Sequence, residues 1–170
     1  DGLVGSEMCI RDSASTRHEG MELSLDYRFA DNWYINGAAS LTRHRYDSRI
    51  NLIGSSGDIK GNDIDTAPRR FGSARLGWEF NSESVTELEW VYMGRYYLEP
   101  DNKHKYDGHS LLNLRVSSQL SSRWQGSLRL TNLLDEDYAE RADFGFGNYR
   151  YFVGQPLGAY LELVYSLGAR

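Results

Sequence analysis

The stretch Met21–Phe29 reads MELSLDYRF and alternates apolar and polar residues without exception. Successive side chains of a β-strand point to opposite faces of a sheet, whereas an amphipathic helix repeats at the longer helical period. The segment therefore predicts a strand that separates an apolar face from a polar one. The apolar face holds Met21, Leu23, Leu25, Tyr27 and Phe29, and the polar face holds Glu22, Ser24, Asp26 and Arg28.

The same alternation recurs along the rest of the chain, in segments separated by polar connections rich in turn-forming residues. Strands joined in order by such connections form an antiparallel up-and-down meander. The sequence thus predicts an all-β chain of about seven strands. The further apolar faces are expected over residues 33–41, 74–80, 88–96, 112–116, 124–130 and 157–167; short turns are expected at 31–32, 81–84 and 121–122, and long loops at 45–69, 99–108 and 135–155.

Alternation alone does not tell which face is buried, because a soluble lipocalin-like barrel would put the same apolar residues inside. Two patterns favour a membrane barrel. Short and long connections alternate, as they do where turns are periplasmic and loops extracellular. Aromatic residues also gather beside the short turns, where they suit the membrane interface. The predicted interface girdle comprises Phe29, Trp33, Trp78, Phe80, Trp124 and Tyr165.

Composition narrows the classes of function. The net charge of −5 argues against a nucleic-acid partner. No apolar run reaches the length of about 18 residues that a transmembrane helix needs. The mean hydropathy of −0.59 does not oppose a membrane barrel, because lipid-facing and lumen-facing residues average out. Bacterial single-chain barrels have an even number of strands, so an odd count of about seven predicts an incomplete part of a large transmembrane β-barrel.

Residues 1–13 read DGLVGSEMCIRDS and show neither strand alternation nor helical spacing. We interpret them as a non-native, adapter-like segment or a disordered one, with an ordinary loop as the alternative. The segment contains Cys9, the single cysteine of the sequence, so no internal disulfide can form. Only the residues that follow this segment therefore bear on function.

Two later stretches carry a family resemblance. Residues 130–141 read LTNLLDEDYAER, and residues 148–156 read NYRYFVGQP. The first is similar to the N-L-(F/L)-D-(K/E)-x-Y segment before the last loop of TonB-dependent receptors, and the second resembles the entry into their final strand. Residues 61–69, GNDIDTAPR, also resemble a segment that approaches a strand in this family. The sequence departs from the family at Leu157, where Arg is usual, and in Ser166–Arg170, which follow the last aromatic residue.

The resemblance implies that residues 14–170 are the C-terminal part of a TonB-dependent receptor β-barrel. Such a receptor lies in the outer membrane of a Gram-negative bacterium and imports a scarce nutrient, such as an iron–siderophore, haem or a cobalamin-like ligand. The expected partners are outer-membrane lipid, the nutrient ligand, and the TonB system through N-terminal segments outside this chain. A passive porin-like barrel and a soluble β-barrel binding module are the alternatives.

We expect no catalytic site, no metal site and no cofactor. The four histidines are scattered without metal-ligand spacing, and no Ser/His/Asp order supports nucleophilic catalysis. The last loop is the candidate ligand site, because aromatic rings and arginine on a loop can grip a ligand. The alternative is that these side chains pack the loop against its neighbours. The candidates are Tyr138, Arg141, Phe144, Phe146 and Tyr149.

Overall fold

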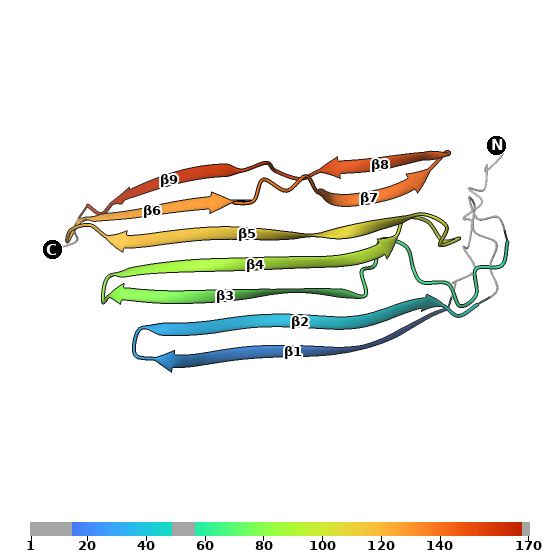
Figure 1. Cartoon of the computed structure of the whole chain (residues 1–170), viewed down its shortest axis with the longest axis horizontal. Helices are drawn as coiled ribbons and strands as arrows, with labels where there is room; N and C mark the ends of the chain where they lie inside the picture. Colours follow the sequence, from blue (N-terminus) through green and yellow to red (C-terminus); the bar gives the residue numbers. More distant parts are fainter. Residues whose placement is uncertain (1–14, 49–56, 168–170) are drawn as a thin grey trace, which may run out of the picture.

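The computed structural model describes residues 15–48 and 57–167, which form nine β-strands. Seven of these make one open antiparallel sheet in the order β1-β2-β3-β4-β5-β6-β9, and β7 and β8 form a separate hairpin (Figure 1). This confirms the predicted all-β meander, and the prediction for residues 1–13 lies outside the described residues. The strands are β1 (Thr16–Ala30), β2 (Trp33–Tyr46), β3 (Arg70–Asn81), β4 (Ser84–Tyr97), β5 (Lys105–Gln119), β6 (Trp124–Thr131), β7 (Ala139–Gly145), β8 (Asn148–Val153) and β9 (Gly158–Tyr165).

The register between strands keeps the two faces apart. Leu76 lies opposite Leu88, and Leu88 lies opposite Leu114, so a row of leucines crosses β3, β4 and β5 on one face. One position away, Arg75 lies opposite Glu89, and the two side chains form an ion pair of 2.7 Å on the other face. The alternation read from the sequence is therefore preserved across the strands.

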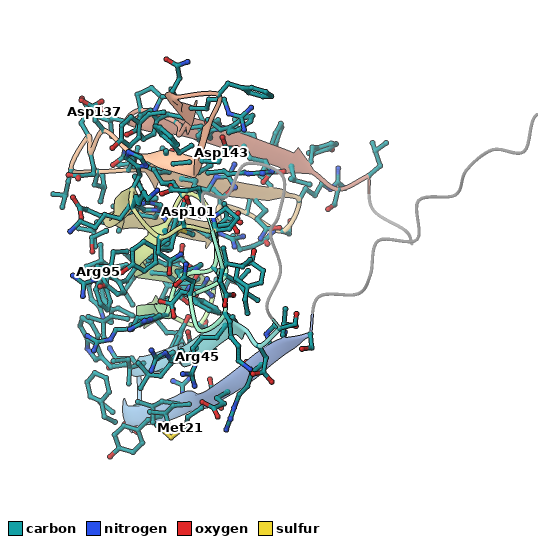
Figure 2. The ribbon with its side chains drawn as sticks, turned by 90° about the vertical axis from the view of Figure 1, so that its right-hand side faces the viewer. Met21, Arg45, Arg95, Asp101, Asp137 and Asp143 are labelled. Atoms are coloured by element: carbon teal, nitrogen blue, oxygen red, sulfur yellow. The ribbon has the colours of Figure 1, made fainter. Side chains whose placement is uncertain are left out.

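The apolar face is the convex face of the sheet. Viewed along the strands from the long-loop end, the sheet curves, and Met21 lies on its outer side (Figure 2). Leu23 on β1 is 67% exposed and Leu161 on β9 is 73% exposed. A soluble barrel would turn such residues inward and bury them, whereas a membrane barrel presents them to lipid. The curvature therefore favours the membrane arrangement. None of the described residues belongs to a helix that is long and apolar enough to cross a membrane.

The short connections lie at one end of the sheet and the long ones at the other (Figure 1). Two residues, Asp31 and Asn32, join β1 to β2, and two more, Ser82 and Glu83, join β3 to β4. The long connections after β2, β4 and β6 gather at the opposite end. This is the segregation that the alternating loop lengths predicted, and it gives the sheet one turn end and one loop end.

The last loop differs from the sequence prediction, because residues expected to be irregular form the β7–β8 hairpin. Its two-residue turn is Phe146-Gly147, whose φ values are +53° and +78°. Positive φ at both central residues is the signature of a type I′ turn, which matches the twist of hairpin strands. A phenylalanine is an unusual occupant of this conformation, so the turn is not apparent in the sequence.

The register offers a direct test at the turn end. Ser84 and Ser118 lie opposite each other on β4 and β5, with their hydroxyls 2.6 Å apart. We expect Ser84→Cys/Ser118→Cys to form a disulfide, because directly opposed residues have Cα atoms within bridging distance. Non-reducing electrophoresis in a Cys9→Ser background would measure it.

The matched control is Ser84→Cys/Ser117→Cys, which should stay reduced because neighbouring residues point to opposite faces. Equal oxidation of the two pairs, or oxidation of the control alone, would contradict the register.

Candidate functional site

The six aromatic residues of the predicted girdle all lie beside the turn end. Trp33 stacks on Trp78 with ring centroids 5.5 Å apart, and Phe29 and Phe80 flank this pair at 6.3 and 5.4 Å. At the other edge of the sheet, the rings of Trp124 and Tyr165 are 4.8 Å apart. The rings thus form two clusters, one across β1–β3 and one across β6 and β9. Their role at the membrane interface stays a prediction.

The loop end is organised by the β7–β8 hairpin, which is fastened to β4 and β5 by two tyrosines. The Tyr96 hydroxyl accepts a hydrogen bond of 2.8 Å from the backbone N–H of Ala142. The Tyr106 hydroxyl accepts one of 3.1 Å from the backbone N–H of Ala139. Tyr96, Ala139 and Ala142 are buried together with Leu98, and this small cluster is the core of the loop end.

A break in the strand alternation points Tyr96 toward the hairpin. Met93 and Tyr96 both pack in the loop-end cluster, although residues three apart in a regular strand face opposite sides. The break coincides with Gly108, which lies opposite Gly94 and has a φ of +88°. A side chain at Gly108 would come within 2.1 Å of the Met93 carbonyl oxygen, so only glycine fits there.

Burial raises the pKa of the Tyr96 and Tyr106 hydroxyls above the usual tyrosine value. Both tyrosines lie beyond the apolar band, on the loop side of Gly94 and Gly108. At neutral pH both side chains stay neutral and keep the oxygen that accepts the hairpin's backbone N–H.

Aromatic rings join the hairpin to the loop between β4 and β5. The ring of Phe144 stacks on His104 at 3.8 Å and meets the Tyr149 ring edge-on at 5.2 Å. His104 is held in turn by Glu99, whose Oε1 lies 3.1 Å from Nδ1 of the imidazole. Two of the five candidates, Phe144 and Tyr149, therefore pack the hairpin against its neighbour. No sequence pattern linked His104 or Glu99 to this loop, because they lie about forty residues earlier in a separate loop.

The other three candidates are placed differently. Tyr138 packs at the base of the hairpin, with its ring 4.6 Å from the His109 ring. The Arg141 guanidinium lies 5.7 Å from the centre of the Phe152 ring and 3.7 Å from an Asp143 oxygen. Phe146 is 98% exposed at the tip of the turn. Arg141 and Phe146 thus face solvent, whereas Tyr138, Phe144 and Tyr149 pack against neighbouring rings.

The base of the hairpin explains the motif at residues 130–141. Asn132 is buried with a φ of +52°, and its Nδ2 donates to the carbonyl oxygens of Glu136 at 3.0 Å and Gln155 at 3.1 Å. Asp135 Oδ1 accepts from the backbone N–H of Leu157 at 2.9 Å. The motif therefore closes the long loop at its entry and exit rather than contacting a ligand.

Two histidines that the spacing treats as unrelated face each other on the concave side. His18 and His44 are cross-strand partners on β1 and β2, with their Nδ1 atoms 2.6 Å apart. No group of three or more His, Cys, Asp or Glu side chains suited to a metal ion occurs among residues 15–48 and 57–167.

The model of the TonB dependent receptor-like, beta-barrel family matches residues 7–133, well over half of the chain. The chain belongs to this family. The family consists of Gram-negative outer-membrane receptors and not of enzymes.

Solved structures of TonB-dependent receptors share the fold. The ferric yersiniabactin uptake receptor FyuA from Yersinia pestis superposes with a TM-score of 0.73 at 18% identity, and the siderophore receptor PiuA from Acinetobacter baumannii with 0.74 at 15%. The unliganded ferric citrate transporter FecA gives 0.75 at 18% identity. Each match covers 88% of this chain but only 22–24% of the receptor. The chain thus spans less than a quarter of the length of these receptors.

The tyrosine anchor of the hairpin can be tested by removing one hydroxyl. Tyr96→Phe leaves the buried N–H of Ala142 without an acceptor, which costs about 1–3 kcal/mol. We expect amide hydrogen exchange across residues 139–153 to accelerate by about tenfold or more, while exchange in β1–β3 is unchanged.

Tyr151→Phe is the control, because Tyr151 is exposed on the same hairpin. Equal exchange in the two variants would show that the Tyr96 hydroxyl does not hold the hairpin.

Proposed function

We propose that this chain is the C-terminal barrel segment of a receptor for TonB-energised uptake of a scarce nutrient, an iron–siderophore, haem or a cobalamin-like ligand. The support begins with the family assignment and the open sheet, whose outer strands β1 and β9 each pair on one side only within the described residues. Lipid cannot satisfy the backbone groups of an unpaired edge. The proposal therefore places further strands against both β1 and β9.

The main support for ligand binding by this segment is the tip of the β7–β8 hairpin. Phe146 holds a backbone conformation that disfavours a bulky side chain, and its side chain is almost fully exposed. Strain of this kind persists where the surroundings impose it and is concentrated at ligand clamps. The packed rings of Phe144 and Tyr149 would hold the hairpin in place. Phe146 and Arg141 would then present a ring and a cation to an incoming ligand.

The ligand class follows from chemistry rather than from this chain's own contacts. A ferric siderophore or ferric citrate complex carries aromatic or carboxylate groups around the metal, which suit a ring beside a guanidinium. The solved relatives are described as ferric yersiniabactin uptake, siderophore and ferric citrate receptors. This likeness supports an iron complex as the first ligand to test.

The orientation of the two faces is testable in the complete receptor. Leu128 on β6 lies on the apolar face, and its neighbour Ser127 lies on the polar face beside Glu162 at 3.3 Å. Leu128→Arg places a charge in lipid and should cost about 2–4 kcal/mol of folding free energy in vesicles.

Ser127→Arg introduces the same charge next to a carboxylate and should change folding by less than about 1 kcal/mol. Denaturant titration of the folded, heat-modifiable receptor measures the folding free energy of both variants. The assignment of faces is wrong if Ser127→Arg is the more damaging variant.

Uptake tests the function itself. Cells that produce the complete receptor should accumulate iron from ferric citrate or a ferric siderophore, or take up haem or cobalamin, and should stop when TonB is deleted. Phe146→Ala should weaken binding of the accepted ligand by about tenfold, the effect of losing a well-placed aromatic contact.

Phe80→Ala is the matched control, because it removes a ring at the turn end and should leave ligand affinity unchanged. Uptake that continues without TonB would replace the proposal with a passive porin-like barrel. Absence of a folded receptor in the membrane fraction would replace it with a soluble binding module.

A further inference from the structure

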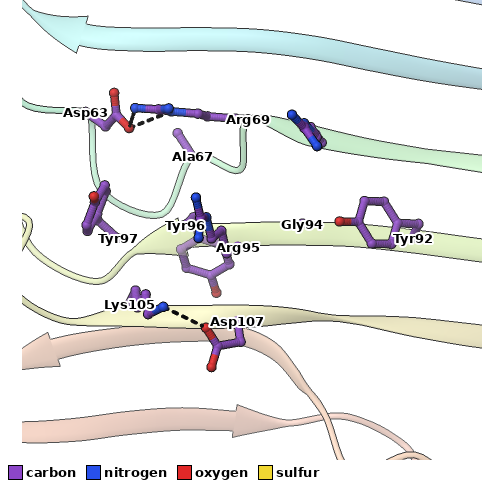
Figure 3. Close-up of a pocket in the computed structure, with 11 residues that line it drawn as sticks. Asp63, Ala67, Arg69, Tyr92, Gly94, Arg95, Tyr96, Tyr97, Lys105 and Asp107 are labelled. Atoms are coloured by element: carbon purple, nitrogen blue, oxygen red, sulfur yellow. Dashed lines mark hydrogen bonds and ion pairs between the residues drawn. The ribbon is translucent and has the colours of Figure 1, made fainter.

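A charged cavity lies on the face of the sheet that meets lipid, just beyond the apolar band. It has a volume of about 380 Å³ and opens between the ends of β3, β4 and β5 (Figure 3). Arg70 lines the cavity from β3. It lies on the same face as the Gly72–Tyr92 pair and closer to the loop end. Arg95 lines the cavity from β4 and projects from the convex side of the sheet (Figure 2). The cavity therefore faces away from the lumen through which a nutrient would pass.

The charges in this cavity are unbalanced. Arg69 forms an ion pair with Asp63, and Lys105 lies 3.4 Å from Asp107. Within the described part of the chain, the guanidinium groups of Arg70 and Arg95 have neither an ion-pair nor a hydrogen-bond partner. Two positive charges thus remain for an external anion, and Arg is the side chain best shaped to hold a phosphate with paired hydrogen bonds.

An apolar hollow of about 350 Å³ lies next to the charged cavity on the same convex face. Its floor consists of small residues, including Gly37, Ala39 and Gly72, and Leu23 and Trp90 stand on its sides. A side chain at Gly72 would come within 2.5 Å of the Ala38 carbonyl oxygen, so no side chain can fill the hollow from this position. Arg70 and Tyr92 line both spaces, so the two hollows adjoin.

A charged cavity joined to an apolar hollow at the edge of a bilayer matches one class of ligand, an amphiphile with a phosphate at its head and hydrocarbon behind it. We propose that this surface binds a phosphorylated glycolipid of the outer leaflet, with its phosphate between Arg70 and Arg95 and an acyl chain along Gly37, Ala39 and Gly72. Tyr92, whose hydroxyl points toward Gly94, marks the boundary between the two parts (Figure 3). Burial of the chain against the hollow adds apolar contact to the attraction between charges.

The geometry also separates this site from nutrient binding. Arg70 and Arg95 lie on the convex side, whereas the exposed tip at Phe146 belongs to the β7–β8 hairpin. Lipid binding is therefore expected to respond to changes that leave uptake unaffected. The inference depends on the outer-membrane location of the family and not on which nutrient is carried.

The test uses the complete receptor, delipidated in detergent and titrated with purified lipopolysaccharide, with binding followed by native mass spectrometry. We expect Arg70→Gln/Arg95→Gln to weaken binding by about tenfold or more, because two charge-assisted contacts are lost. Ala39→Leu, which fills the apolar hollow, should weaken it as well. The control Arg115→Gln/Arg129→Gln makes the same charge change on the concave face and should bind like the wild type.

Two further measurements distinguish the source of the phosphate. Dephosphorylated glycolipid should bind the wild type about as weakly as intact glycolipid binds Arg70→Gln/Arg95→Gln, and millimolar inorganic phosphate should not displace the intact lipid. Wild-type affinity in the Arg70/Arg95 variant would overturn the proposal, as would displacement by inorganic phosphate alone. An equal loss in the Arg115/Arg129 control would also overturn it, since the effect would then reflect net charge.

Discussion

Backbone hydrogen bonding between neighbouring strands is the constraint on which the rest of this structure depends. Within a bilayer no water is present to satisfy an unpaired N–H or C=O group, so each strand must pair along its length. Pairing fixes the register, and the register decides which side chains share a face. The leucine row from Leu76 to Leu114 and the Arg75–Glu89 ion pair follow from one alignment of β3, β4 and β5. A slip of one residue would exchange lipid-facing leucines for charges.

The rule of alternation is broken at the loop end, and the break has consequences on both faces. Around Gly94 and Gly108 the strands change the side to which their residues point. On one side Tyr96 turns inward, enters the small core and holds the hairpin through Ala142. On the other side Arg95 turns outward, beyond the last apolar pair. The change of side around Gly94 and Gly108 thus positions the β7–β8 hairpin and places a cation beside the apolar face.

The sequence predicts what period-two alternation and local turn chemistry determine. Met21–Phe29 was sufficient to identify a two-faced strand, and loop lengths were sufficient to assign the turn end and the loop end. The hairpin was missed because its turn residues, Phe146-Gly147, lack the usual Asn-Gly or Asp-Gly signal. Its position depends on hydroxyls from Tyr96 and Tyr106, more than thirty residues away. Contacts of that range leave no periodic trace in a single sequence.

The candidate site shows the same division between local and long-range information. Aromatic enrichment drew attention to the last loop, but it could not separate rings that support the loop from rings that face solvent. His104 stacks against Phe144, whereas Phe146, two residues further along, is almost fully exposed. The motif around Asn132 was read as a family marker, and its hydrogen bonds show that it closes the loop.

The charges of the concave face explain why these seven strands need others around them. Arg28 pairs with Glu79 at 2.8 Å and Arg75 with Glu89 at 2.7 Å, in ladders that run across β1, β3 and β4. Closing seven strands on themselves would force these long charged side chains into a narrow, poorly hydrated interior, where each ion pair loses more hydration than it regains. A wider barrel leaves water beside them. The polar lining and the edges of β1 and β9, each unpaired within the described residues, therefore both favour the proposed wider barrel, in which the sheet continues beyond both edges before it closes.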